Sequence, residues 1–226
     1  MSTAGPPDPR PLSELVDAFL AETYERNPLV GSNLGLVEHD DRLPDRSASA
    51  WERQRAAVTR WLAAFRGVSD DGLDPEDRAD RDVAIAYLTG ESILADTHPE
   101  KHDPDVYGGA GLNGVHSLFL FRPHDATTVA SACARLGAIP ELLAQGRANL
   151  DAELASPLIL TRAVQQAAGG VDYCQSGVAG QVDDPVLAAR LLEAGSAAAD
   201  AYQEWGAHLA ALAERATGSW ALGEER

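Results

Sequence analysis

Apolar side chains recur at intervals of three and four residues along most of this chain, and this spacing restricts the fold more than any other feature. Between residues 48 and 66, Trp51, Val58, Trp61 and Phe65 fall on one face of a helix. The arginines of the same segment fall on the opposite face. This pattern is typical of an amphipathic helix that packs one face into a core.

Several of the periodic segments begin at residues that favour helix initiation. Asp74-Pro75 and Asp184-Pro185 each place a carboxylate at the cap and a proline at the first helical position. Ser13 and Asp125 are placed to cap two others, and Asn27-Pro28 predicts the end of the first helix. The helices expected on these grounds span about residues 13–27, 48–66, 75–96, 125–136, 139–154, 157–168 and 185–216.

Three segments lack a clear helical pattern. Glycines and an acidic cluster between residues 28 and 46 predict a loop that can include a helical turn. Histidine, proline and glycine crowd residues 98–114, where we expect no regular structure. Residues 115–121 are apolar but few, so periodicity cannot separate a buried helix from a strand.

These segments together predict an all-α fold, an irregular bundle of about eight helices joined by short links. A chain of 226 residues is long enough to bury a sizeable core. Four prolines in residues 1–11 predict a flexible tail there. We expect residues 12–226 to form a single helical domain.

The charge of the chain restricts its partners. Acidic residues outnumber basic residues 35 to 18, which gives a formal net charge of −17. The arginines are scattered among acidic residues and form no basic stripe in the sequence. Phosphate backbones and anionic membrane surfaces would be repelled, so neither nucleic acid nor a membrane is an expected partner. The first residues lack the pattern of a signal peptide, and no apolar run reaches about 18 residues, so we expect a cytoplasmic protein.

Two histidine-containing motifs suggest metal binding and fail on spacing. His98 and His102 lie four residues apart as in a zincin helix, but Glu100 is in the wrong place and Pro99 disrupts the helix. His39-Asp40-Asp41 supplies too few ligands for a transition metal. A solvated loop and an exposed acidic turn are the expected structures.

The remaining candidates for chemistry are few. His116 and His124 flank an apolar segment, and each could act as an acid or base beside a carboxylate. We name these two as weak catalytic candidates and expect no metal or cofactor site in this chain. The glycines of residues 108–111 lack the flanking strand and the continuation of a phosphate-binding loop.

Segments from three parts of the chain resemble one family. They are Asn27-Pro28 through Gly35 with His39–Asp45, then Leu136–Leu150 with Ile139-Pro140 and Gln145-Gly-Arg-Ala-Asn-Leu150, and finally Ala216–Glu225. Their order and spacing are similar to those of the bacterial domain-of-unknown-function family 885, DUF885. The resemblance covers nearly the whole chain.

The resemblance implies a largely helical protein related to zinc metallopeptidases. Members of the family look like hydrolases that carry an H-E-G-x-P-G-H motif in a C-terminal half, where two histidines would hold zinc and the glutamate would activate water. No residue of this chain matches those positions, so we assign none. Zinc is expected only in a C-terminal half.

Three functions remain open. The chain could be the non-catalytic N-terminal half of a truncated or split DUF885-like hydrolase, shaping a substrate cleft with a C-terminal catalytic half. It could instead be a short stand-alone relative that acts as a binding or scaffold protein for another chain, or a freestanding helical enzyme that uses His116 or His124. The first function predicts an exposed apolar face for the partner half and a small-molecule or peptide substrate.

Overall fold

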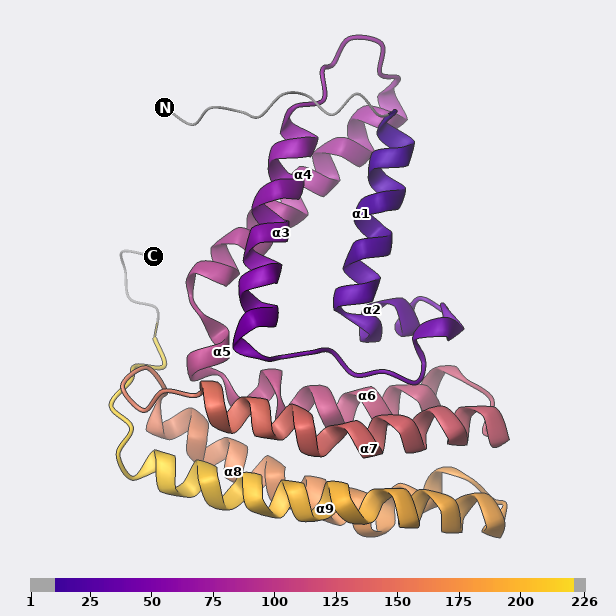
Figure 1. Ribbon diagram of the computed structural model, residues 1–226, viewed down its shortest axis with the longest axis vertical. Coiled ribbons are helices and arrows are strands. Elements are labelled where there is room, and N and C mark those ends of the chain that lie inside the picture. Colours follow the sequence, from indigo (N-terminus) through magenta and orange to yellow (C-terminus); the bar gives the residue numbers. More distant parts are fainter. Residues whose placement is uncertain (1–10, 222–226) are drawn as a thin grey trace. The chain divides into compact units, whose positions relative to one another are not determined.

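The computed structural model describes residues 11–221, and these residues contain nine α-helices and no β-strand (Figure 1). The expected all-α fold of about eight helices is therefore confirmed. The chain forms two compact units, one up to Arg26 together with Ser49–Pro99 and the other made of Asn27–Ala48 and the chain from Glu100 onward. Whether both belong to a single domain over residues 12–226 stays a prediction, and the expected tail lies almost entirely outside the described residues.

The first unit consists of α1 (Leu12–Arg26), α3 (Ala48–Arg66, all but its first residue) and α4 (Pro75–Asp96). The predicted bounds of α3 and α4 are confirmed. Asp74 caps α4 because its side chain accepts hydrogen bonds from the backbone N–H groups of Glu76 and Asp77. Ser13 was the wrong cap for α1, since the helix begins one residue earlier, where the Leu15 N–H already bonds to the Pro11 carbonyl.

Aromatic rings fill the core of the first unit. Phe19 meets Trp61 and Phe65 edge to face, with ring centroids 5.7 and 5.5 Å apart. Glu22 of α1 accepts hydrogen bonds from Arg60 and from the indole N–H of Trp61 on α3. The predicted apolar face of α3 is therefore the one that packs.

A row of apolar side chains on α4 lies outside this core. Val83 is 67% exposed, Tyr87 49% and Leu94 60%. Their spacings of four and seven residues place them on the same side of the helix. The first unit thus presents an apolar row, defined by these three residues, in which Tyr87 is partly covered because its ring meets that of Phe19 at 6.2 Å.

The second unit contains the other helices. They are α2 (Pro28–Asn33), α5 (Pro99–His102, all but its first residue), α6 (Gly108–Phe121), α7 (Ala126–Asn149), α8 (Pro157–Asp172) and α9 (Pro185–Ala213), with single turns η1 (Val37–His39), η2 (Pro104–Val106), η3 (Tyr173–Gly177) and η4 (Ala179–Gln181). The helical turns α2 and η1 lie in the expected loop. In Figure 1, α6 and α7 form one layer and α8 and α9 a second layer beneath it.

The prediction of irregular structure over residues 98–114 was wrong. That segment contains α5, η2 and the first half of α6, which continues through the apolar residues 115–121 as a helix and not a strand. Glycines make this possible because they allow close packing: a Cβ at Gly111 would lie 2.6 Å from the Tyr202 hydroxyl, and one at Gly114 would lie 2.7 Å from Leu43. Packing outweighs the low helix propensity of glycine here.

The predicted break between residues 136 and 139 was also wrong, because α7 runs through Pro140. Proline removes one hydrogen bond of the helix. Leu136, Ile139 and Leu143 are fully buried on both sides of that position and continue a single apolar face. Burial of this face holds the helix together across the missing bond.

Candidate functional site

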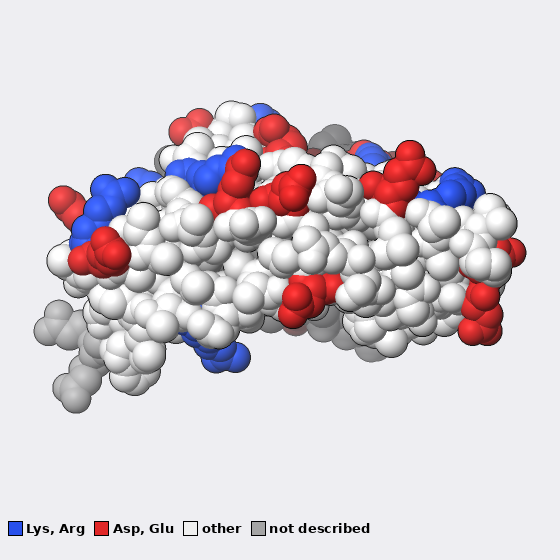
Figure 2. Space-filling view, turned by 90° about the horizontal axis from the view of Figure 1, so that it is seen from below, with Lys and Arg blue, Asp and Glu red and all other residues white. Residues whose placement is uncertain are grey.

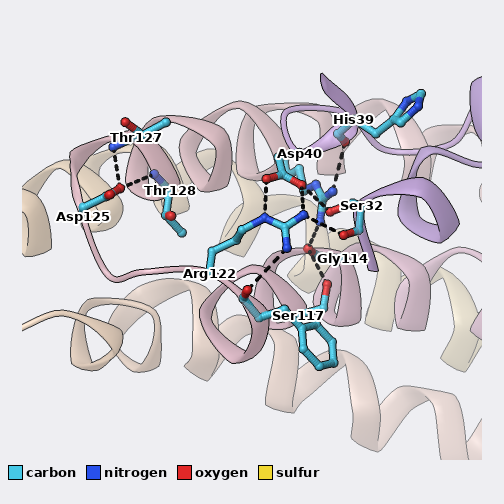
Figure 3. Close-up of polar contacts among 11 residues, drawn as sticks. Ser32, His39, Asp40, Gly114, Ser117, Arg122, Asp125, Thr127 and Thr128 are labelled. Carbon is cyan, nitrogen blue, oxygen red and sulfur yellow. Dashed lines mark hydrogen bonds and ion pairs between the residues drawn. The ribbon is translucent and has the colours of Figure 1, made fainter. Parts of the chain in front are cut away.

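A buried ion pair joins the segment between α2 and α3 to the residue that follows α6. Asp40 accepts hydrogen bonds from Arg122 Nε at 2.7 Å and Nη2 at 2.9 Å, and from Ser32 Oγ at 2.6 Å (Figure 3). Arg122 Nη2 also donates to the Ser32 carbonyl at 2.7 Å. Asp40 is 7% exposed, so this pair is shielded from water and from salt.

A second guanidinium lies beside the pair. Arg135 of α7 is fully buried and donates to the backbone carbonyls of Gly114 and His39, the latter at 3.1 Å. Burial lowers the pKa of Arg135 to about 10, and the charge of Asp40 offsets part of this effect. The group stays charged at neutral pH, with one carboxylate close to two guanidinium groups.

The expected exposed acidic turn at His39-Asp40-Asp41 is therefore wrong for two of its three residues. His39 is 5% exposed, and Figure 3 shows its imidazole pointing away from the ion pair while its carbonyl faces Arg135. Only Asp41 is exposed. The partner of Asp40 is 82 positions further along the chain, which local sequence could not reveal.

A pocket of about 250 Å³ opens elsewhere on the second unit, among η2, α6, α8 and α9. Its polar side chains are Asp105, Asn113 and Gln166, and its aromatic side chains are Tyr202 and Trp205. The Tyr202 hydroxyl donates to the Gly108 carbonyl at 2.7 Å and so joins α9 to the start of α6. A concave site lined by apolar side chains and a few polar groups is the usual form of a small-ligand site.

Electrostatics single out Asp105 in this pocket. Partial burial raises its pKa, Asp103 raises it further, and the positive charge of Arg162 partly compensates. Its carboxylate occupies the space where a Cβ on residue 109 would lie, so Gly109 is needed for this position. No sequence pattern indicates this pocket, because its residues come from four separate elements.

The two histidines named as catalytic candidates do not lie together in this pocket. His124 shares a hydrogen bond of 2.8 Å with the Phe119 carbonyl, and His116 meets the ring of Tyr173 edge to face at 6.2 Å. Neither forms an ion pair with a carboxylate in the part of the chain that the structure describes. An acid–base role for either histidine stays a prediction.

The zincin-like motif also takes a different form from the expected solvated loop. Glu100 is 4% exposed and lies in the single turn of α5, while His98 is exposed in a left-handed conformation with φ of 54°. The hydroxyl of the buried Tyr107 donates a hydrogen bond to the Glu100 carbonyl. This bond holds the turn against the core. Across residues 11–221, no group of three or more histidines, cysteines or acids is placed to hold a metal ion.

Hydrogen bonds link residues in or next to the segments that carry the family resemblance. Arg46, next to the first motif, donates its N–H to Gln145 and accepts from the Asn149 side chain, both in the second motif. Thr217 and Gly218 of the third motif donate to the carbonyls of Ala152 and Ala155. These residues fasten chain segments to the helical bundle.

The surface on the side of α8 and α9 is mostly uncharged, and the charged side chains on it are scattered (Figure 2). Lysine and arginine do not gather into a patch on this face. None of the helices in residues 11–221 has both the length and the apolar character needed to cross a membrane.

Comparison with known proteins gives a family and a fold. The family described as bacterial protein of unknown function, DUF885, matches residues 28–226. The solved structure of a candidate lipoprotein of unknown function from Shewanella oneidensis is similar with a TM-score of 0.79 at 20% identity. The similarity covers 96% of this chain but only 41% of that protein. No curated protein matches the sequence.

Proposed function

Since the chain belongs to the bacterial DUF885 family, as its motifs indicated, we propose that it forms the helical, non-catalytic N-terminal part of a DUF885-type hydrolase. In this role it shapes one wall of the cleft for a small-molecule or peptide substrate. The described residues do not fit a zinc site, so the metal and its chemistry would belong to the C-terminal part.

The observation that carries the proposal is the unequal coverage of the structural relative. Nearly all of this chain corresponds to less than half of that protein. A fold that recurs as one portion of a larger chain is suited to work beside the remaining portion. The relative supports the fold alone, and the hydrolase chemistry comes from the family resemblance.

The apolar row on α4 supports the same proposal. Val83, Tyr87 and Leu94 place three exposed or partly exposed apolar side chains on one side of a helix, and exposed apolar surface is where protein partners commonly bind. Charged residues, including Asp82 and Glu91, flank the row. An apolar centre with a polar rim is the common form of a protein interface.

Co-purification tests this proposal. The full chain would be mixed with the separately produced C-terminal part of a longer DUF885 protein and analysed by gel filtration. We expect a 1:1 complex that Val83→Glu and Leu94→Glu weaken, because a buried charge at an apolar interface is costly.

Val186→Glu provides the control, since Val186 is 68% exposed on α9, close to the value for Val83. Circular dichroism of each variant would verify that the helices are intact. If the unmodified chain elutes alone, the two-part hydrolase proposal is wrong. If all three variants bind equally well, the interface lies elsewhere than on α4.

A further inference from the structure

We infer that the pocket among η2, α6, α8 and α9 binds a small ligand through a protonated amino group, with Asp105 as the residue that contacts the ammonium. The inference concerns the second unit by itself. It does not depend on the proposed hydrolase role, and nothing in the family match assigns this site.

Asp105 is available to a cationic ligand. Within residues 11–221 no basic side chain forms an ion pair with it, although the charge of Arg162 reaches it from α8. The turn η2 fixes its position, because Asp103 accepts a hydrogen bond from the Asp105 N–H at 2.9 Å. A carboxylate held on one wall of a pocket can form a charge-assisted hydrogen bond with an ammonium group.

The other walls suit the same kind of ligand. Trp205 and Tyr202 line the pocket but are each only 1% exposed, so they form an apolar floor for the alkyl part of the ligand. Asn113 and Gln166 are exposed residues that also line it, and neither has a side-chain hydrogen-bond partner among the described residues. They can bind a second polar group of the ligand.

The volume of the pocket and the charge of the protein restrict the class of ligand further. A volume of about 250 Å³ is below the roughly 300–1,000 Å³ of pockets for drug-sized ligands, so the ligand is small. The net charge of −17 attracts cations and repels anions at long range. A bound ammonium would also offset the partial burial that raises the pKa of Asp105.

Nuclear magnetic resonance on the full chain tests the inference with three probes of similar size, n-butylamine, n-butanol and butyrate. The indole N–H of Trp205 is the reporter, assigned by its loss in Trp205→Phe. We expect n-butylamine at millimolar concentration to shift this resonance saturably, and the neutral and anionic probes to shift it much less.

Asp105→Asn removes the charge and keeps the shape, and we expect it to weaken n-butylamine binding at least about tenfold. Asp172→Asn changes a carboxylate of α8 that is exposed, as Asp105 is, but lies outside the pocket, and it should leave binding within about twofold. Gly109→Ala is a second variant, since its Cβ would displace the Asp105 carboxylate and weaken binding with the charge retained.

Three results would overturn the inference. They are no saturable shift with n-butylamine, equal shifts with n-butanol, and binding by Asp105→Asn that equals the unmodified chain. Failure of the co-purification experiment would leave these measurements unaffected, so the two proposals can fail separately.

Discussion

Asp40 and Asp41 are adjacent and chemically identical, yet their surroundings are opposite. Asp40 is buried and accepts three hydrogen bonds from Ser32 and Arg122. Asp41 is exposed, and its one ion pair in the described residues, with Arg42, is long at 4.0 Å. The value of a charge to stability depends on whether removing it leaves an unpaired partner in the interior.

Substitution of Asp40 by asparagine should lower the free energy of unfolding by about 3–5 kcal/mol, because two guanidinium groups would remain buried without their carboxylate. Asp41→Asn is the matched control and should change it by less than about 1 kcal/mol. Urea denaturation followed by circular dichroism measures both values. Equal effects of the two substitutions would show that the buried pair adds no stability.

Glycines decide how closely the helices of the second unit approach one another. In α7, a Cβ at Gly146 would lie 2.7 Å from the Trp205 ring and 2.8 Å from the Tyr107 ring. Gly137, two and a half turns earlier in the same helix, has no atom within 4 Å of that position. Gly146 is therefore required for packing, whereas Gly137 only lowers helix propensity.

Alanine at these two positions should have opposite effects. Gly146→Ala should destabilise the protein by about 1–3 kcal/mol, because the aromatic rings must move. Gly137→Ala should stabilise it by about 0.5–1 kcal/mol, since alanine favours the helix and meets no neighbour. Thermal unfolding of both variants measures the difference, and a stabilising Gly146→Ala would contradict the close packing of α7 against α9.

At the scale of the whole molecule, the core of the second unit contains several groups that hold their protons tightly. Burial raises the pKa of the Cys174 thiol from 9.0 to about 12, and burial also raises the pKa of Tyr173 and Tyr202. Cys174 is fully buried, so we expect a neutral thiol that is unreactive at neutral pH.

Stability should therefore fall in alkali. A raised pKa in the folded state means that the contribution of Cys174 is fully present below pH 9 and is lost as the pH rises toward 12. The free energy of unfolding should fall by about 1 kcal/mol between pH 9 and pH 10 through this group alone. Urea midpoints measured from pH 8 to pH 10 should decline more steeply for the unmodified chain than for Cys174→Ala.

The two proteins are compared by the slope of the urea midpoint against pH. The midpoint itself is lower for Cys174→Ala at every pH, because the substitution removes packing contacts. Arg135 acts in the opposite sense as the pH approaches 10, since its pKa is lowered to about 10 in the folded state. Arg135 is present in both proteins, so its contribution cancels in the difference between their slopes. Parallel slopes for the two proteins would show that Cys174 is not held in its neutral form by the fold.

The sequence by itself determined the fold class, the family, the bounds of α3 and α4 and the starts of α7, α8 and α9. The caps at Asp74, Asp125 and Asp184 each bond to backbone N–H groups two and three residues further on, as expected. These features could be predicted because a helix and its cap depend on residues within about four positions of one another.

Only the tertiary structure decided where charges and glycines lie relative to the core. The burial of Asp40 depends on Arg122, and the helix at Gly108–Phe121 depends on Tyr202 and Trp205 of α9. The pocket likewise combines Asp105 with residues of three further helices. The contact of Asp40 with Arg122 and those of the α6 glycines with α9 join positions roughly 80 to 100 residues apart, and burial in a core is a property that no local pattern specifies.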